Sequence, residues 1–322
     1  MRVLFAALAS VGHTYPMVPL AIAAREAGHD VHFAVGEDVH PALAANGLNP
    51  FRPADSFYEI YPEDLAPDLE RLHPDLVIHG WGVPGAAIAA ARAGIPGLWH
   101  GFGRMFPDGI GLELPSRVAE AATRPHLDIC PPSLQDKDFT GTPLRPVPFG
   151  MPAPLPEWTD PLVYLTLGTA FGTRKVLQTI LAGLAALPVD VIVASGKIRL
   201  DVVPDNVIAR EWVPQAQLLP HASVVVHHGG SGTTLGALAA GVPQLVLPQG
   251  ADQFTNATAL TEAGAALRLL PEELTTTAVA DAVRTLLPHK GNDHRDAARA
   301  IAAEIAGMPA PEDVARTLPD YT

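Results

Sequence analysis

Short apolar runs alternate with helical stretches along the first half of the chain, and this alternation restricts the fold more than any other feature. Arg2 to Ala7 is apolar, a helical stretch follows from Pro16 to Ala27, Gly28 ends it, and a second apolar run spans Val31 to Val35. The pattern returns in three further segments, Asp75–Ile78, Ala86–Ala93 and Ile95–Trp99. Repeated strand, helix, strand units predict a parallel sheet covered by helices on both faces.

The second half repeats this alternation. Its strand-like runs are Leu162–Leu167, Val189–Ala194, Val207–Trp212, Ser223–His227 and Gln244–Leu247. Between the halves, the proline-rich segment from Pro143 to Pro161 disfavours both helix and sheet. The sequence therefore predicts two α/β domains, each a doubly wound parallel sheet, over residues 1–145 and 161–306, with a linker over 146–160. Open α/β sheets bind ligands at the carboxyl ends of their strands, so function is expected in the loops there.

Composition excludes several classes of protein. Lys+Arg 21 against Asp+Glu 34 gives a net charge of −13, the wrong sign for a partner with a phosphate backbone, so no nucleic acid is expected. No apolar run approaches the roughly 20 residues of a membrane span. The single cysteine, Cys130, permits no internal disulfide and no thiolate metal cluster. We interpret it as a small buried side chain in a protein of the reducing cytoplasm.

The strongest candidate site lies between Val224 and Leu235, where an apolar run enters a glycine-rich turn and then an alanine-rich helix. Glycines let the backbone approach a ligand closely, and the unpaired N–H groups of a helix's first turn favour a phosphate. The members of this candidate phosphate site are His228, Gly230, Ser231, Gly232, Thr233 and Thr234, of which the two threonines add hydroxyl donors. The alternative is an ordinary strand-to-helix turn in which Ser231 is the N-cap.

A second candidate is His13, in the segment Gly12-His13-Thr14 directly after the first apolar run. This position places the imidazole at the carboxyl end of the first predicted strand. An imidazole with a pKa near ~6.5 suits general-base catalysis close to neutrality. Because the chain contains 13 histidines, an ordinary loop histidine is the alternative interpretation.

Three other motifs support no separate function. Gly80 to Gly85 satisfies the dinucleotide-binding pattern G-x-G-x-x-G, but Pro84 removes a donor and no acidic residue follows about 20 residues later. Asp136-Lys137-Asp138 is a D-x-D pair in a loop-like segment, and without paired cysteines or a His-x-x-x-His helix no metal site is expected. The Ser231 region lacks the last glycine of a G-x-S-x-G hydrolase turn.

A longer pattern runs through the second half. It comprises Trp212-Val213-Pro214-Gln215, His228-Gly229-Gly230-Ser231-Gly232-Thr233-Thr234, Pro248, Asp252-Gln253 and Asn256-Ala257. This pattern resembles the donor-binding signature of family 1 nucleotide-sugar glycosyltransferases. With Gly12-His13-Thr14-Tyr15-Pro16 near the start, the chain resembles most the actinobacterial branch that glycosylates antibiotics and other natural products.

The resemblance implies a GT-B fold, in which two Rossmann-like domains face a cleft. The first domain would bind the acceptor, the second would bind most of the nucleotide sugar, and residues 307–322 would cross back to the first domain. His13 would deprotonate an acceptor hydroxyl, which attacks the anomeric carbon of the donor with inversion. Neither a metal nor a cofactor is implied, because the nucleoside-diphosphate sugar is a co-substrate.

The resemblance also assigns roles in donor binding. His228, Gly232 and Thr233 would hold the diphosphate together with the helix N-terminus. Trp212 would stack on the base, and the Val213 backbone would contact the base edge. The other implied donor-binding residues are Thr169, Gln215, Gly230, Ser231, Asp252 and Gln253, of which Thr169 would reach a phosphate and the last two would bind sugar hydroxyls. A core aromatic and a helix cap are the alternative interpretations of Trp212 and Thr169.

Two departures from the family pattern affect the expected partner of His13 and the expected nucleotide of the donor. Pro84 stands where many relatives carry an aspartate that orients the histidine. Asp108 is our candidate substitute, and the alternative is that His13 acts alone or with a base supplied by the substrate. Gly236 stands at the position of the family's ribose-binding glutamate, and a site without that acceptor tolerates a missing 2′-hydroxyl. A dTDP-sugar, often a deoxyhexose, is therefore expected in preference to a UDP-sugar.

The first half is also short for this family, both between Pro53 and Pro74 and between Met105 and Arg145. An open acceptor pocket for large planar or flexible aglycones is therefore expected. The alternatives from other classes are a nucleotide-sugar-binding protein that has lost turnover, a nucleotide-sugar epimerase, and a dinucleotide oxidoreductase. The expected partners are thus a dTDP- or UDP-sugar and a small-molecule aglycone, and a homodimer is left open.

Overall fold

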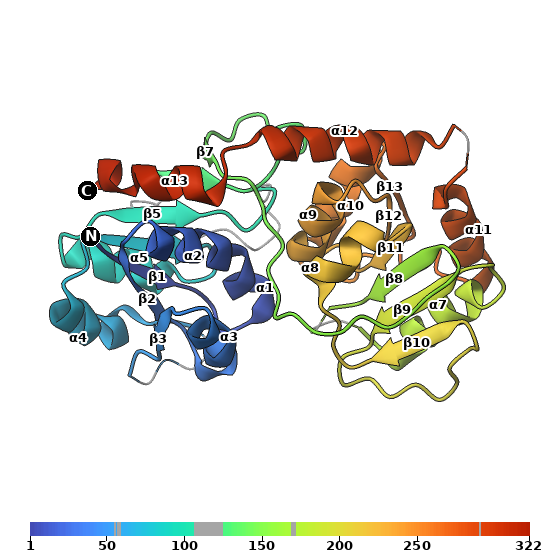
Figure 1. The fold of residues 1–322 in the computed structure, drawn as a ribbon, viewed down its shortest axis with the longest axis horizontal. Helices are drawn as coiled ribbons and strands as arrows, with labels where there is room; N and C mark the ends of the chain where they lie inside the picture. The colour runs from blue at the N-terminus through green and yellow to red at the C-terminus, as the bar shows by residue number, and fades with distance from the viewer. Residues whose placement is uncertain (55, 57–58, 106–124, 169–171, 290) are drawn as a thin grey trace. The chain divides into compact units, whose positions relative to one another are not determined.

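The computed structural model describes residues 1–54, 56, 59–105, 125–168, 172–289 and 291–322. They divide into two compact units, Met1–Phe149 with Gly307–Thr322, and Gly150–Ala306. Each unit contains one parallel β-sheet with helices packed around it (Figure 1). The predicted fold class, two α/β domains with doubly wound parallel sheets, is confirmed.

The sheet of the first unit has seven strands among the described residues. In spatial order these are β3 (Asn49–Phe51), β2 (Asp30–Ala34), β1 (Arg2–Ala6), β4 (Leu76–Gly80), β5 (Gly97–His100), β6 (His126–Asp128) and β7 (Thr142–Pro143), all paired in parallel. The order reverses between β1 and β4, which defines the switch point of the sheet. Because helices cover both faces, Val3 to Ala6 of β1 are all buried, which explains their uninterrupted apolar run.

The first unit includes the last residues of the chain. Its helices are α1 (Val11–Thr14), α2 (Val18–Glu26), α3 (His40–Ala45), α4 (Pro62–Leu72), α5 (Pro84–Arg92) and α13 (Pro311–Thr317). Helix α13 packs against α2, and the two are drawn close together in Figure 1. The N–H of Arg145 donates to the carbonyl of Pro309 at 2.8 Å, which joins the end of the first unit's sheet to this returning segment.

The sheet of the second unit has six strands among the described residues. In spatial order these are β10 (Val207–Arg210), β9 (Asp190–Ala194), β8 (Leu162–Thr166), β11 (Val224–His227), β12 (Gln244–Val246) and β13 (Ala266–Arg268), again all parallel. Its helices are α7 (Arg174–Leu184), α8 (Gln215–Leu218), α9 (Ser231–Ala239), α10 (Gln253–Glu262), α11 (Thr276–Leu286) and α12 (Asp293–Gly307). The switch point lies between β8 and β11.

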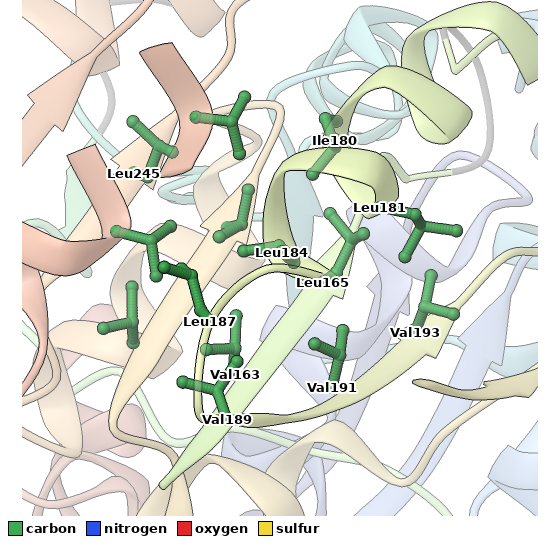
Figure 2. Packing of buried hydrophobic residues seen from close by; sticks show 14 of the residues in the cluster. Val163, Leu165, Ile180, Leu181, Leu184, Leu187, Val189, Val191, Val193 and Leu245 are labelled. Atoms are coloured by element: carbon green, nitrogen blue, oxygen red, sulfur yellow. The ribbon is translucent and has the colours of Figure 1, made fainter. Parts of the chain in front are cut away.

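Helix α7 illustrates why these segments fold as they do. The hydroxyl of Thr173 caps it by accepting from the N–H of Val176 at 3.3 Å. Leu177, Ile180, Leu181 and Leu184 recur at helical spacing and form one buried face. Figure 2 shows the last three against the valines and leucines of β8 and β9. Each fully buried leucine contributes about 1.5–3 kcal/mol, so this face provides much of the second core.

Every apolar run predicted to be a strand overlaps a strand of the structure, although the observed ends differ from the predicted ones. Strand β10 ends at Arg210 rather than Trp212, and the helix predicted to begin at Ala86 begins at Pro84. The strands β3, β6, β7 and β13 were not predicted, because each has only two or three residues, and these include polar residues or proline. Cys130 is buried as expected. Among the described residues, every helix is too short or too polar to span a bilayer.

Candidate functional site

The glycine-rich turn of the second unit lies at the switch point of its sheet. Strand β11 ends at His227, the turn follows, and α9 begins at Ser231. The N-cap of α9 is Gly230, and no side chain bonds to the cap, so the alternative that Ser231 is the N-cap is wrong. A Cβ on Gly232 would meet no atom within 4 Å among the described residues. The backbone at the start of α9 is therefore uncovered on the side of Gly232, which leaves room for an anion near the helix N-terminus.

The imidazole of His228 is held between two glycines. A Cβ on Gly168, which has φ +69°, would lie 2.7 Å from its Nε2, and a Cβ on Gly230 would lie 2.5 Å from the same atom. Burial lowers the pKa of His228, and a backbone hydrogen bond to Thr166 opposes part of this effect. Its Nδ1 is buried without a hydrogen-bond partner among the described residues. A buried, unpaired nitrogen beside a helix N-terminus is typical of a ligand-binding group.

Asp252 forms a buried cluster with Ser231 and Asn256. Its Oδ2 accepts from the hydroxyl of Ser231 at 3.1 Å and from Nδ2 of Asn256 at 2.9 Å. Burial raises the pKa of Asp252, and these two hydrogen bonds lower it in part. One carboxylate oxygen is therefore committed to the fold, and the geometry leaves Oδ1 as the oxygen for a ligand.

Gln253, next along the chain, closes the loop that precedes α10. Its buried Oε1 accepts from the N–H groups of Gln249 at 2.9 Å and of Gly250 at 3.2 Å. The side-chain oxygen therefore holds the loop, and Nε2 is the atom whose hydrogens remain for a ligand.

Gln215 connects the start of α8 to α9. Its Oε1 accepts from the hydroxyl of Thr233 at 3.1 Å and from that of Tyr164 at 3.3 Å. Trp212 is 47% exposed, whereas Val213 is 3% exposed and packs into the core. The interpretation of Trp212 as a core aromatic is therefore wrong. The structure thus brings Gln215 and Thr233 together, and gives Trp212 a free face for stacking.

His13 lies at the carboxyl end of β1 in the first unit. Its ring stacks on Phe102, with centroids 4.4 Å apart and planes at 16°. A Cβ on Gly82 would lie 3.4 Å from its Cε1, so the loop after β4 borders it as well. Burial lowers the pKa of His13 to about 4. The imidazole is neutral at pH ~7 and able to accept a proton.

The orienting carboxylate of His13 is not found among the described residues. Pro84 is the first residue of α5, as the sequence count implies. No described side chain forms a hydrogen bond or ion pair with the imidazole of His13. Two predicted site residues, Asp108 and Thr169, lie outside the described residues.

The weaker motifs have structural explanations. A Cβ on Gly85 would lie 2.0 Å from the carbonyl oxygen of Ile60, so this glycine admits the protein's own backbone rather than a pyrophosphate. Asp136 pairs with Arg104 at 3.4 Å. Among the described residues, no three histidine, cysteine, aspartate or glutamate side chains cluster in a way that would hold a metal ion.

Four residues beside these sites were not singled out by sequence reasoning. His227 and Gln244 form a hydrogen bond beneath the glycine turn, Asn256 bonds to that turn, and Phe102 stacks on His13. Asn256 is part of the glycosyltransferase-like pattern, and His227 directly precedes His228. The sequence alone does not reveal which buried group each side chain will bond to. Phe102 carries no local signal, because its role depends on strand order.

Comparison with known proteins finds one family and full-length relatives. Residues 178–320 match the family described as Erythromycin biosynthesis protein CIII-like, C-terminal domain. The chain is 35% identical over 373 residues to the L-demethylnoviosyl transferase of Streptomyces niveus, covering 99% of this chain and 97% of the relative. It is 34% identical over 381 residues to the elloramycin glycosyltransferase ElmGT of Streptomyces olivaceus, covering 99% of this chain and 97% of that relative.

Solved structures match over both units. The spinosyn rhamnosyltransferase SpnG complexed with thymidine diphosphate has a TM-score of 0.83 and 26% identity, covering 99% of this chain and 100% of that chain. SpnG complexed with spinosyn aglycone has a TM-score of 0.81 and 25% identity, with the same coverage. The two alignments to the Streptomyces relatives exceed the 322 residues of this chain, so those relatives contain segments that it lacks.

Proposed function

The chain belongs to the GT-B glycosyltransferases of antibiotic biosynthesis, and on that premise we propose that it transfers a hexose from a dTDP-sugar to a hydroxyl of a natural-product aglycone, with inversion. The observation that carries the proposal is the turn from His228 to Gly230, where glycines, an unpaired imidazole nitrogen and the N-terminus of α9 converge at the switch point. A nucleoside diphosphate has the charge that such a turn attracts.

The donor is held by the second unit. The N–H groups of α9, the hydroxyl of Thr233 and the imidazole of His228 bind the diphosphate and stabilise the charge that it gathers on leaving. Because these donors are fixed in the fold, the reaction requires no divalent metal and no further cofactor. The exposed ring of Trp212 stacks on the base, and the free atoms of Asp252 and Gln253 bind sugar hydroxyls.

The preference for dTDP over UDP rests on Gly236. This glycine supplies no side-chain acceptor for a ribose 2′-hydroxyl, so little affinity is lost when that hydroxyl is absent. The thymidine diphosphate bound by SpnG supports this preference.

The acceptor is bound by the first unit. Trp81, His126 and Phe139 form a row of half-buried rings, with centroids 6.2 Å and 4.8 Å apart along the row. Such rings offer flat apolar surface to a planar aglycone. The neutral imidazole of His13 accepts the proton of the attacking hydroxyl, and the short chain leaves the acceptor site open to large aglycones.

The first test is calorimetric titration of the protein with dTDP and UDP in parallel, with EDTA present throughout. We expect metal-free binding of both, with dTDP the tighter ligand, and weakened binding of dTDP by His228→Ala. Equal affinities would remove the donor preference. Unchanged dTDP binding by His228→Ala would displace the diphosphate site from this turn.

A second test separates transfer from two alternatives. The protein is incubated with dTDP-glucose and EDTA, with and without 4-methylumbelliferone as a planar phenolic acceptor, and the products are identified by mass spectrometry and chromatography. We expect a glucoside only when the acceptor is present. Nucleotide binding without any glucoside would favour a protein that has lost turnover. The structural argument for that alternative is that no described carboxylate contacts His13. Conversion of the donor without acceptor would favour an epimerase.

A further inference from the structure

The backbone N–H and carbonyl groups of Gly229 each form a hydrogen bond with a buried side chain. Its N–H donates to Nδ1 of His227 at 3.1 Å, and its carbonyl accepts from Nδ2 of Asn256 at 2.9 Å. Gly229 has φ +94°, and a Cβ there would lie 2.9 Å from Cγ1 of Val246. The backbone therefore adopts a conformation that only glycine enters easily, and two hydrogen bonds fix its orientation.

A second hydrogen bond determines the tautomer of His227. Its Nε2 lies 2.7 Å from Oε1 of Gln244, which can only accept, so Nε2 carries the proton and Nδ1 is left as an acceptor. Nε2 of Gln244 in turn donates to the carbonyl of Thr234 in α9 at 3.4 Å. Both side chains are fully buried, and burial lowers the pKa of His227 to about 3. The ring therefore stays neutral under ordinary conditions.

These contacts join three elements beneath the turn. His227 is the last residue of β11, Gln244 is the first of β12, and Thr234 lies in the first turn of α9. Asn256 connects a fourth element, α10, to the turn, and its Nδ2 also lies 3.3 Å from the hydroxyl of Ser231. The turn that leads into α9 is thus oriented by buried side chains of β11, β12 and α10.

We propose that His227, oriented by Gln244, is a positioning residue for donor binding: it fixes the Gly229 peptide so that His228 and the N-terminus of α9 meet the diphosphate without rearrangement. His227 does not touch the ligand. Preorganisation of this kind increases affinity because the turn is not ordered at the moment of binding. The inference rests on the proposed binding of the diphosphate at this turn.

Two substitutions of His227 separate its proposed role in positioning the turn from its contribution to the stability of the fold. The side-chain oxygen of His227→Asn occupies the place of Nδ1 and keeps an acceptor for Gly229, but it loses the contact to Gln244. The amide of His227→Gln reaches the place of Nε2 and keeps the contact to Gln244, but it leaves the Gly229 N–H without an acceptor. Each variant loses one hydrogen bond of the pair and some packing, so both are expected to have lowered melting temperatures.

The measurement is the Kd of dTDP by calorimetry, beside the melting temperature, for the parent protein and both variants. We expect His227→Gln to bind dTDP about five- to tenfold more weakly, the effect of roughly one lost hydrogen bond, and His227→Asn to bind within about twofold of the parent. A purely structural role predicts instead that affinity follows the melting temperature in both variants, and that result would overturn the inference.

Gln244→Met provides a second route if neither variant folds. It has similar volume and lies away from the turn, but it removes the acceptor that holds the proton on Nε2 of His227. We expect weaker dTDP binding, because the ring of His227 loses one of its two hydrogen bonds, together with a shifted Nε2 resonance of His227 in ¹⁵N imidazole spectra. An Nδ1–H signature in the parent protein, or unchanged affinity in Gln244→Met, would contradict the inference. Absence of dTDP binding by the parent protein would overturn the proposed donor site itself, before any variant is compared.

Discussion

The ring of Phe102 lies flat against the imidazole of His13, with centroids 4.4 Å apart. His13 follows β1 and Phe102 follows β5, so the contact joins two loops at the carboxyl edge of one sheet. Pro84 stands where the family resemblance implies an orienting aspartate, and among the described residues the imidazole of His13 stacks on Phe102 and meets no carboxylate. An aromatic contact restrains the ring plane, but it does not stabilise an imidazolium as a carboxylate would.

Replacing His13 with alanine should lower turnover by roughly 10² to 10⁴ and leave the Kd of dTDP nearly unchanged, because a general base acts on the acceptor and not on the nucleotide. Initial transfer rates and calorimetry measure the two quantities. His29→Ala is the matched control, since this histidine precedes β2 at the opposite edge of the same sheet and should retain full activity. Unchanged turnover in His13→Ala would remove this residue from the mechanism.

Replacing Phe102 with alanine should change the pH dependence of transfer. In the parent protein the pKa of His13 is about 4, so the neutral base is present at all higher pH values and kcat/KM should show no inflection near 6.5. Without the covering ring, the pKa of His13 should move up toward its ordinary value. The variant should then lose activity as the pH falls below ~6.5, while the parent does not.

The control for this prediction is Phe102→Tyr, which keeps the stacked ring and should keep the flat profile. Circular dichroism at each pH confirms that both variants remain folded. Identical pH profiles for the parent and Phe102→Ala would show that stacking does not control the titration of His13.

Replacing Gly230 with alanine should weaken dTDP binding by at least about tenfold, because the new Cβ would lie 2.5 Å from Nε2 of His228 and the imidazole would have to move. Calorimetry measures the change. Gly307→Ala is the control, since a Cβ there meets no described atom within 4 Å and lies far along the chain from the turn. Parent-like affinity in Gly230→Ala would mean that the position of His228 is unimportant for the diphosphate.

Mild acid should destabilise the fold. Burial lowers the pKa of five histidines: to about 4 for His13, His100 and His126, to about 3 for His227, and below its ordinary value for His228. Between pH 6.5 and about 4 the unfolded chain binds protons on these side chains and the folded chain does not, so the free energy of unfolding decreases as the pH falls, by up to about 1.4 kcal/mol per pH unit for each histidine.

Two buried carboxyl groups, Asp128 and Asp252, have raised pKa values and act in the opposite direction at the lower end of this window. Urea unfolding at a series of pH values measures the net slope. His227→Asn removes one of the five histidines and should give a shallower slope than the parent. An equal slope in both proteins would contradict the assignment of His227 as a buried neutral group.

Much of the fold could be predicted because central parallel strands are buried on both faces. The runs at Leu162–Thr166 and Val224–His227 are buried throughout and mostly apolar for that reason. They can therefore be recognised as strands even where their ends are placed wrongly. The strands β3, β6, β7 and β13 escaped detection because each has only two or three residues and no continuous apolar run. The diphosphate turn could be recognised because a strand, glycines and a helix start are contiguous in sequence, so local chemistry is enough to indicate an anion site.

The sequence by itself determined the two parallel sheets, the glycine turn and its expected ligand class, since these depend on periodicity and on contiguous residues. Only the tertiary structure decided which distant side chains meet: Phe102 on His13, Gln244 on His227, and Asn256 with Asp252 on Ser231. The physical reason is that a buried polar or aromatic group takes its partner from whichever strand or helix the sheet order places beside it. That order is a property of the whole chain, and no local pattern encodes it.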